Sequence, residues 1–549
     1  MGIEPDEFAG RPIVGIANSW SELNNCNINL REVAEAVKRG VLAAGGLPLE
    51  FPTISLGEEL MKPSAMLYRN LMAMDVEEML RSHPIDGVVL LCNCDKTTPA
   101  QLMAAASADL PAIQVNGGPR GVGNWRGKPV GSGTDIWRHW DELRAGRLSR
   151  ESWDELEACI ACGAGACNTM GTASTMTGLS EALGMMLPGS SSISAADGRR
   201  LAVAERSGRR IVELIAEDVR PSQILTPQAF DNAARTLAAI GGSTNAIVHL
   251  IAIAGRRNHR LTLERFNELS RTTPFLVNVS PSGEHLMDAF DAAGGIPAVM
   301  REIRSLLDLD CLTVVGQTLG EVLDVAKCHN RDVIRSSSSP VSRDGALAAL
   351  QGNLAPHGAI IKTSAASSKL FKHRGPAVVF ESYEDMLARV DHADLPVSAE
   401  SVLVLKNAGP KGVPGFPEWG MIPVPKKLLE QGVTDLVRIS DSRMSGTSFG
   451  TVVLHVSPEA AAGGPLSLVE NGDEIELNVD ERRLTLHVSN DELETRRAAW
   501  VAPETRHVRG YPRLYIDHVL QAHEGCDFDF LCARNEEALE FVPPTVGRS

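Results

Sequence analysis

Two thiols stand beside an Asp–Lys pair in the stretch LLCNCDKTTPAQ (90–101), at the point where an apolar run ends. Cysteine thiolates bind iron, zinc or a second thiol, and a neighbouring carboxylate suits a harder cation. Two more cysteines stand in similar settings: Cys26 shortly after a predicted strand, and Cys167 in the Gly- and Ala-rich stretch GAGACNTMGTASTM. Metal ligation, a redox pair and ordinary buried cysteine are all compatible with this spacing.

The other cysteines have simpler interpretations. Cys159 and Cys162 form a C-x2-C pair, which is typical of zinc ligation or of a thioredoxin-like pair. No second such pair stands at zinc-finger spacing, so structural cysteine is the preferred interpretation of both. The scattered cysteines of the later part of the chain are interpreted as buried, hydrophobe-like residues: Cys311, Cys328, Cys526 and Cys532.

Three other stretches contain polar side chains where an apolar run or a Gly/Pro-rich loop ends. ISLGEELMKPS contains Glu58 and Glu59, and GPKGVPGFPEWG contains Glu418. RISDSRMSGTSFG ends a strand-like run in a small-residue turn with Ser445 and Thr447. Each stretch also has a plainer interpretation, as a turn or a solvated carboxylate.

The elements that must position these residues alternate along the first third of the chain. RPIVGIANSW, IDGVVLLCNC and PAIQVNGG predict buried strands, and LREVAEAVKRGVLAA predicts a helix by its apolar spacing. Thr98 and Pro99 predict the N-cap and first position of another helix. This alternation indicates an α/β domain with a parallel sheet covered on both faces. Because ligands bind beyond the carboxyl ends of such strands, Cys26, Cys94 and Cys167 could converge at one edge; three unrelated buried cysteines are the alternative.

The composition changes near SSSSPVSRDG (336–345). Residues 200–310 are predicted to be largely helical, whereas short strand-like runs separated by Gly, Pro, Asn and Asp follow the change. ENGDEIELNVDERRLTLHV predicts a hairpin whose turn lies near Asp480 and Glu481. We therefore expect an N-terminal α/β domain over residues 1–340, and a C-terminal β-rich domain, a barrel or a sandwich with peripheral helices, over 341–549.

Composition and charge exclude several classes of function. The 549 residues have a formal net charge of −16, which repels nucleic acids and anionic membranes. No run approaches the roughly 18 apolar residues of a membrane helix, and MGIEPDEFAGRP lacks the features of a secretory signal, so a cytoplasmic protein is expected. The Gly-rich stretches match neither G-x-G-x-x-G nor the P-loop pattern, which leaves a dinucleotide or ATP site without support.

Six stretches, in this order, resemble the dihydroxyacid dehydratase/6-phosphogluconate dehydratase superfamily. They cover nearly the whole chain: NSWSELNNCN, LLCNCDKTTPAQ, GACNTMGTASTM, GGSTNAIVHLIAIAG, KNAGPKGVPGFPEWG and SDSRMSGTSFGTVVLHVSPEA. The resemblance implies a hydro-lyase, dependent on an iron–sulfur cluster and magnesium, that converts a 2,3-dihydroxy acid into a 2-keto-3-deoxy acid. It also implies a homodimer or homotetramer.

The resemblance implies a role for each matching residue. The cysteines that match the ligands of a [2Fe–2S] cluster are Cys26, Cys94 and Cys167. The residues that match the magnesium carboxylates are Glu58, Asp95 and Glu418. Lys96 matches a lysine that is carbamylated and bridges to magnesium. Ser445 matches the proposed catalytic base, and Thr447 matches a neighbouring active-site hydroxyl.

These residue types suit the implied chemistry. Three cysteine ligands leave one iron open, and that iron can act as a Lewis acid on the C3 hydroxyl. A carbamate oxygen suits Mg²⁺, whereas a lysine ammonium would repel it. Ser445 would have to act as an alkoxide, with its pKa lowered by the metal, to remove the weakly acidic C2 proton. The resulting enol tautomerises to the keto acid.

Within the family, the resemblance is greater to the branch that dehydrates sugar acids such as L-arabinonate, D-xylonate or D-gluconate. CDKTTPA, CNTMGTASTM and ISLGE resemble that branch, whereas branched-chain biosynthetic enzymes tend to show CDKNMPG. The context of Glu58 differs from the biosynthetic pattern, and Glu59 competes for its ligand role. A dihydroxyacid dehydratase acting on 2,3-dihydroxyisovalerate and a non-catalytic iron–sulfur or thiol redox protein are the alternatives. Cys92 is expected to be a packed core cysteine.

Overall fold

A four-stranded parallel sheet forms the base of the N-terminal half. The structure, a computed structural model, describes residues 2–4 and 9–533. The order of the strands is β2 (Leu47–Pro52), β1 (Ile13–Asn18), β3 (Gly87–Cys92) and β4 (Ala112–Asn116). Every residue of β3 is buried, as expected of a strand covered on both faces. The predicted α/β fold with a parallel sheet is confirmed.

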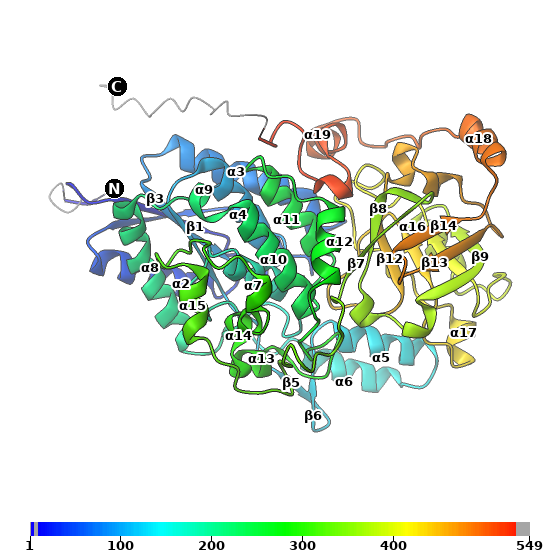
Figure 1. The fold of residues 1–549 in the computed structure, drawn as a ribbon, viewed down its shortest axis with the longest axis horizontal. Coiled ribbons are helices and arrows are strands. Elements are labelled where there is room, and N and C mark those ends of the chain that lie inside the picture. Colours follow the sequence, from blue (N-terminus) through cyan, green and yellow to red (C-terminus); the bar gives the residue numbers. More distant parts are fainter. Residues whose placement is uncertain (1, 5–8, 534–549) are drawn as a thin grey trace.

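Helices cover this sheet and fill the space between it and the C-terminal half (Figure 1). They are α2 (Leu30–Ala43), α3 (Arg69–Ser82), α4 (Thr97–Ala108), α5 (Thr134–Arg144), α6 (Arg150–Ile160), α7 (Thr172–Ala182), α8 (Arg199–Glu217), α9 (Pro221–Ile224), α10 (Pro227–Ile240), α11 (Asn245–Gly255), α12 (Leu263–Arg271), α13 (Met287–Ala293), α14 (Gly295–Glu302) and α15 (Leu319–Val325). The largely helical region predicted over residues 200–310 corresponds to α8 through α14.

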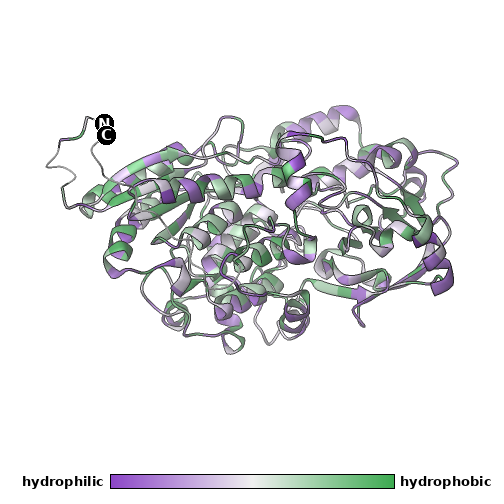
Figure 2. Cartoon of the chain, turned by 90° about the horizontal axis from the view of Figure 1, so that it is seen from above, coloured by the Kyte–Doolittle hydropathy of each residue, from purple (hydrophilic) through white to green (hydrophobic). Residues whose placement is uncertain are grey.

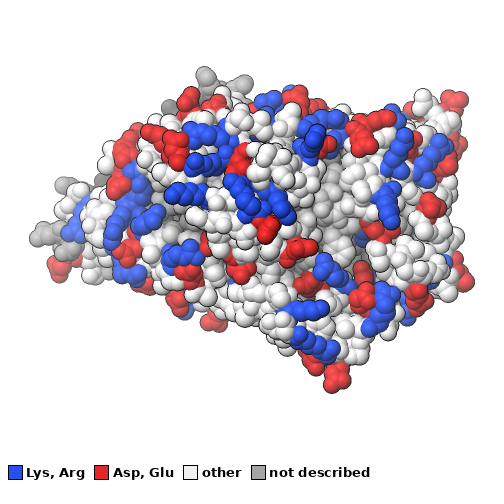
Figure 3. Space-filling model, turned by 60° about the horizontal axis from the view of Figure 1, so that its bottom comes forward, with Lys and Arg blue, Asp and Glu red and all other residues white. Residues whose placement is uncertain are grey.

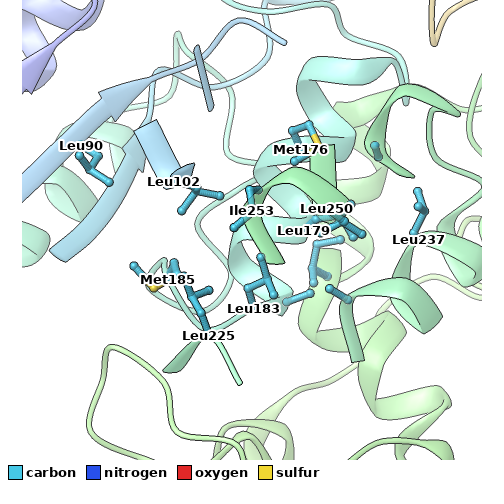
Figure 4. Close-up of a cluster of buried hydrophobic side chains, with 14 of the residues drawn as sticks. Leu90, Leu102, Met176, Leu179, Leu183, Met185, Leu225, Leu237, Leu250 and Ile253 are labelled. Atoms are coloured by element: carbon cyan, nitrogen blue, oxygen red, sulfur yellow. The ribbon is translucent and has the colours of Figure 1, made fainter. Parts of the chain in front are cut away.

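Helices α4, α7 and α11 are buried along almost their whole length. Their side chains are mostly small or apolar on every side, so these helices pack against their neighbours and not against solvent. Leu102 of α4, Leu179 of α7 and Leu250 of α11 belong to one buried cluster (Figure 4). The N-terminal ends of these helices therefore lie inside the molecule.

The C-terminal half contains a closed barrel. Around it the strands follow the order β10 (Val402–Leu405), β11 (Arg438–Ser440), β12 (Val452–Ser457), β8 (Ala355–Ile361), β7 (Ala348–Gly352), β14 (Arg483–Leu486), β13 (Glu474–Asn478) and β9 (Lys372–Phe380). Strands β9 to β12 are parallel neighbours, and β13 and β14 pair antiparallel as the predicted hairpin. Of the two β-rich architectures considered, the barrel is the one observed.

Apolar side chains fill the barrel, and the helices of this half lie outside it. Figure 2 colours the interior of both halves predominantly hydrophobic and many outer helices and loops hydrophilic. The outer helices are α16 (Tyr383–Arg389), α17 (Lys426–Glu430), α18 (Asn490–Ala499) and α19 (Gly510–His518). This arrangement agrees with the expected barrel with peripheral helices.

A small insertion after β4 connects the two halves. It contains the hairpin of β5 (Gly123–Trp125) and β6 (Lys128–Val130), followed by α5 and α6. Arg144 at the end of α5 donates through Nη2 to Asp391 Oδ1 at 2.6 Å and to the carbonyl of Val424 at 2.9 Å. These bonds hold α5 against the barrel, although its sequence belongs to the N-terminal half.

Helix α4 begins two residues earlier than predicted. Its first residue is Thr97 and its N-cap is Lys96, which makes no side-chain capping bond. The prediction of Thr98 as the N-cap is wrong because its hydroxyl donates to the carbonyl of Cys94 at 3.3 Å instead of accepting from the helix. The Thr97 hydroxyl donates to the same carbonyl at 2.9 Å, which fixes the turn that joins β3 to α4.

Positive and negative side chains are interspersed over the face of the molecule in Figure 3. The excess of acidic residues in the sequence is therefore not separated into one region on that face. Among the residues that the structure describes, none of the helices combines the length and the hydropathy needed to cross a bilayer.

Helices α2 and α8 cross at two glycines. A Cβ added at Gly40 would lie 1.9 Å from the carbonyl oxygen of Glu205, and one added at Gly208 would lie 2.2 Å from the carbonyl oxygen of Val37. Both distances are far below van der Waals contact, so the two backbones approach more closely than any side chain would allow. This crossing anchors α8 beside the parallel sheet.

The Gly208→Ala variant should be less stable than the wild type, because the new methyl must push α8 away from α2. Overpacking of this kind costs about 2 kcal/mol, which exceeds the gain in helix propensity and lowers the unfolding midpoint by about 3 °C. Gly255→Ala is the control, since its Cβ would meet nothing nearer than the Cys532 sulfur at 3.9 Å. Thermal unfolding followed by circular dichroism tests this; equal midpoints for Gly208→Ala and the wild type would contradict the tight crossing.

Candidate active site

The candidate active site lies where the carboxyl ends of strands from both halves meet. Loops after β2 and β3 contain Glu58 and Asp95, and loops after β10 and β11 contain Glu418 and Ser445. One cavity of about 270 Å³ brings these side chains together. The predicted residues that line it are Cys26, Glu58, Cys94, Asp95, Cys167, Glu418, Ser445 and Thr447. The remaining predicted residue, Lys96, is fully buried and contacts three of them.

Lys96 is enclosed by three carboxylates. Its Nζ lies 2.7 Å from Asp95 Oδ2, 3.0 Å from Glu58 Oε2 and 3.2 Å from Glu418 Oε1. The Lys96 side chain is 0% exposed, so water does not replace these partners. Two of the carboxylates come from the N-terminal half and one from the barrel.

A second buried cation, Arg443, approaches the same carboxylates from the barrel side. Its Nη1 donates to Glu418 Oε1 at 2.8 Å, and its Nη2 donates to Ser64 Oγ at 2.8 Å. Asn245, the first residue of α11, donates through Nδ2 to the same Glu418 oxygen at 2.7 Å. Glu418 Oε1 therefore accepts from Lys96, Arg443 and Asn245 together.

The pKa values in this group follow from burial and from the neighbouring charges. Burial and the Arg443 guanidinium lower the pKa of Lys96, but the three carboxylates outweigh both and raise it. Burial would raise the pKa of Glu418, yet Lys96 and Arg443 hold it below its usual value. Burial raises the pKa of Glu58 despite the nearby Lys96. Lys96 is thus an ammonium and Glu418 a carboxylate at neutral pH.

The three predicted cluster cysteines face the same cavity. Cys94 is buried and interacts with Cys26, and this contact together with burial raises the pKa of the Cys94 thiol. Burial raises the pKa of Cys167 to about 12, although the Arg120 guanidinium opposes the shift. Such thiols stay protonated unless a bound cation stabilises their thiolates.

Arg120 forms an ion pair with Glu59, the acid next to Glu58 in the sequence. Its Nη2 donates to Glu59 Oε1 at 2.7 Å, and its Nε donates to the carbonyl of Gly165 at 3.2 Å. Glu59 is 47% exposed and pairs with Arg120, whereas Glu58 contacts the buried Lys96. The structure therefore places Glu58, and not its competitor Glu59, in the carboxylate group.

Ser445 and Thr447 lie on the loop between β11 and β12. Ser445 Oγ and Thr447 Oγ1 are 2.9 Å apart, and the Thr447 backbone N–H also donates to Ser445 Oγ at 3.4 Å. Gly446, which lies between Ser445 and Thr447, packs closely against the start of α7. A Cβ at Gly446 would lie 2.5 Å from the backbone nitrogen of Thr172, so this loop packs directly on the start of α7.

The donor set fits a divalent cation in its chemistry. Three carboxylates converge on one point, and among the described residues the buried Glu58 Oε2 has Lys96 Nζ, at 3.0 Å, as its ion-pair partner and makes no further hydrogen bond. Within the described part of the chain, no group of three or more His, Cys, Asp or Glu side chains forms a ready-made metal site. The Lys96 ammonium occupies the centre of the carboxylates, so a metal requires that this charge be removed. The three thiols suit iron equally well by type.

The other cysteines lie apart from this cavity or beneath it. Cys92 is buried at the end of β3, as predicted, and burial raises the pKa of its thiol to about 12. Cys159 lies in the last turn of α6, and Cys162 is exposed just beyond it. All ten cysteines are free thiols.

Two family descriptions match this chain. The N-terminal domain of dihydroxy-acid/6-phosphogluconate dehydratases matches residues 11–322, and the C-terminal domain of the same family matches residues 332–526. The chain therefore belongs to the dihydroxy-acid/6-phosphogluconate dehydratase family, a family of hydro-lyases. The family resemblance found in the sequence is confirmed.

Relatives that are about half identical to this chain include dehydratases of sugar acids. An L-arabonate dehydratase from Azospirillum brasilense is 53% identical over 541 residues, with 97% of this chain and 93% of the relative covered. A 6-deoxy-6-sulfo-D-gluconate dehydratase from Pseudomonas putida is 50% identical over 536 residues, with the same coverage of 97% and 93%. A dihydroxy-acid dehydratase from Caldanaerobacter subterraneus subsp. tengcongensis is 40% identical over 533 residues, with 95% of each chain covered. The chain is thus more similar to these dehydratases of sugar acids than to that dihydroxy-acid dehydratase.

Sequence reasoning missed four residues of the site: Arg120, Arg443, Asn245 and Trp137. Arg443 and Asn245 bond to Glu418, Trp137 bonds to Thr447, and Arg120 lines the cavity. Arg443 and Asn245 lie inside stretches that carry the family resemblance, so their positions held a usable signal. Arg120 and Trp137 lie in a stretch with no recognised pattern. Only the fold brings these two beside the thiols and the Ser445 loop.

His455 is a buried neutral histidine beneath the site. It lies in β12, packs its ring on Phe416 at 5.3 Å between centroids, and has no partner at Nε2 among the described residues. Burial, together with the Arg443 guanidinium, lowers its pKa to about 3. In the unfolded chain an ordinary histidine binds a proton near pH 6.5.

Acidification should therefore destabilise the protein through His455. Between pH 6.5 and about 3 the unfolded state binds a proton that the folded state does not, which costs about 1.4 kcal/mol for each pH unit. His455→Asn, which tolerates the positive φ of 56° at this position, should show a correspondingly shallower loss of stability. Urea unfolding from pH 7.5 to 4.5 measures the two slopes. The exposed His392→Asn variant is the control, and parallel curves for His455→Asn and the wild type would contradict the assignment.

Proposed function

We propose that the protein dehydrates an aldonate, such as L-arabinonate, D-xylonate or D-gluconate, to the 2-keto-3-deoxy acid. The observation that supports this most is the shared lining of one cavity by three thiols, the three carboxylates that surround Lys96, and Ser445. The similarity to dehydratases of sugar acids favours an aldonate over 2,3-dihydroxyisovalerate, the substrate of the alternative activity.

The proposal includes two inorganic groups. Cys26, Cys94 and Cys167 would hold a [2Fe–2S] cluster, and the carboxylates Glu58, Asp95 and Glu418 would hold Mg²⁺ with a carbamylated Lys96. When bound, these groups supply Lewis acidity toward the C3 hydroxyl and toward the carboxylate and C2 hydroxyl of the acid.

Charge balance favours carbamylation of Lys96 together with magnesium. Converting the ammonium to a carbamate removes two units of positive charge from the centre of the carboxylates, and Mg²⁺ brings two units back. The net charge of the buried group therefore stays the same, and Arg443 still pairs with Glu418. A carbamate without the metal would instead place four anionic groups together, which burial strongly disfavours.

Ser445 is the proposed base of the reaction. When Ser445 carries negative charge, its oxygen can accept from both the hydroxyl of Thr447, 2.9 Å away, and the Thr447 backbone N–H, 3.4 Å away, and these bonds stabilise that charge. Ser445 Oγ removes the proton from C2, and the C3 hydroxyl leaves as hydroxide, which takes the proton back from Ser445 and departs as water. The enol product then gains a proton at C3 and loses the proton on its C2 oxygen, which gives the keto acid.

An activity screen across C4–C6 aldonates should give a 2-keto-3-deoxy acid from at least one of them, with less or no turnover of 2,3-dihydroxyisovalerate. Semicarbazide trapping of the keto acid measures the product. Ser445→Ala should reduce turnover at least about 1,000-fold, because the base is lost, while the visible absorption of the iron–sulfur protein is unchanged. Turnover of 2,3-dihydroxyisovalerate alone would favour the biosynthetic alternative. An iron-free preparation with full activity would contradict the cluster.

Carbamylation of Lys96 should depend on magnesium, because only the metal balances the charge of the carbamate. Incubation with ¹³C-bicarbonate and Mg²⁺ should give one carbamate carbon signal by NMR, which EDTA removes. Lys96→Met should lack this signal, and Lys362→Met, which changes another buried lysine, should retain it. A signal that persists equally in the Lys96 variant would assign the carbamate elsewhere.

A further inference from the structure

Two side chains of helix α5 donate hydrogen bonds to Thr447, one to its backbone carbonyl and one to its hydroxyl. The Thr134 hydroxyl, in the first turn of α5, donates to the Thr447 carbonyl at 2.8 Å. One turn further on, the indole N–H of Trp137 donates to Thr447 Oγ1 at 3.3 Å. Trp137 is half-buried and lines the same cavity as Ser445. These bonds link the insertion after β4 to the catalytic loop of the barrel.

Two glycines complete the enclosure of the Thr447 side chain. A Cβ at Gly133 would lie 2.4 Å from Thr447 Oγ1, and a Cβ at Gly171 would lie 2.9 Å from Thr447 Cγ2. Thr447 is 5% exposed. The side chain is therefore confined by backbone on two sides, and Oγ1 is kept between the Trp137 indole and Ser445.

The indole of Trp137 fixes the direction of one hydrogen bond at Thr447 Oγ1, and the charge of Ser445 fixes the direction of the other. An indole N–H can only donate, so Thr447 Oγ1 accepts from Trp137 and has its own hydrogen left to give. Among the described residues, Ser445 Oγ at 2.9 Å is the other side-chain partner of Thr447 Oγ1. When Ser445 is an alkoxide it can only accept, so the chain runs from Trp137 through Thr447 to Ser445. Successive bonds in one direction polarise and strengthen one another.

We infer that Trp137 is a positioning residue that orients the Thr447 hydroxyl as a donor to Ser445. This inference rests on the proposed role of Ser445 as the base. Trp137 does not itself exchange a proton with the substrate in this scheme. By donating to Thr447, Trp137 leaves the Thr447 hydroxyl to donate to Ser445. This hydrogen bond stabilises the Ser445 alkoxide, which is the form that removes the C2 proton.

The reactivity of Ser445 can be measured without a substrate. A fluorophosphonate probe should label Ser445 in preference to Ser132, which lines the same cavity, and peptide mass spectrometry distinguishes the two sites. Trp137→Phe keeps an aromatic ring but removes the N–H, and it should slow labelling of Ser445 about tenfold. Trp140→Phe, the same change one turn further along α5 at an exposed residue outside the cavity lining, should leave the rate within about twofold. Trp137→Leu provides the same test if the Phe variant does not fold.

A double-mutant cycle separates the relay from direct contact with the substrate. Thr447→Val removes the relay hydroxyl and should slow labelling at least as much as Trp137→Phe, whereas Thr447→Ser keeps the hydroxyl and should stay within about threefold of the wild type. Adding Trp137→Phe to Thr447→Val should have no further effect. In turnover assays the Trp137 variant should lower kcat by the same factor and change KM little.

Three results would overturn the inference. They are equal labelling of Ser445 and Ser132 in the wild type, unchanged labelling in Trp137→Phe, and an equal effect of Trp137→Phe in the wild-type and Thr447→Val backgrounds. The labelling data decide the matter even if no aldonate is turned over, which would contradict the proposed function alone. If the variants change the rate of Ser445 labelling as expected but no aldonate is turned over, the role of Trp137 is supported and the proposed aldonate substrate is contradicted.

Discussion

The neutralisation of buried Lys96 constrains the whole arrangement. An isolated ammonium taken out of water costs several kcal/mol, and Lys96 is fully buried. Its partners Glu58, Asp95 and Glu418 lie on loops after β2, β3 and β10. Lys96 keeps all three partners only where those loops meet, which sets the carboxyl edge of the parallel sheet against the carboxyl ends of the parallel strands of the barrel. The cavity that contains Ser445 forms at this junction.

The buried helices reinforce the same point from below. α4, α7 and α11 begin beside the site: α4 directly after Lys96, α7 at Thr172 and α11 at Asn245, whose Nδ2 lies 3.1 Å from Thr172 Oγ1. The positive ends of three helix dipoles thus face the carboxylates and thiols, and they favour the anionic forms of both and of an acid substrate. Because these helices are buried in the core, their N-terminal ends are held beside the site and contribute to its electrostatics.

The sequence was sufficient for features encoded by local patterns. Continuous apolar runs predicted β1, β3 and β4, and the short polar turn near Asp480 predicted the β13–β14 hairpin. It could not choose between barrel and sandwich, because closure depends on pairings between distant strands such as β9 and β13. It also could not separate Glu58 from Glu59, since neighbours in a loop differ only in direction. The N-cap of α4 was misassigned because a threonine hydroxyl can donate to the preceding turn as readily as it accepts from the helix.

The distribution of the buried charges between the halves bears on how the chain assembles. The N-terminal half contains Lys96 together with Glu58 and Asp95, and the barrel contains Arg443 together with Glu418. Each half thus includes a counter-ion for its own cation, and neither needs the other to avoid burying a lone positive charge. During synthesis the N-terminal half can compact while the barrel is still incomplete. Contact between Lys96 and Glu418 then joins two preformed ion pairs into one group, so docking of the halves and completion of the site are a single event.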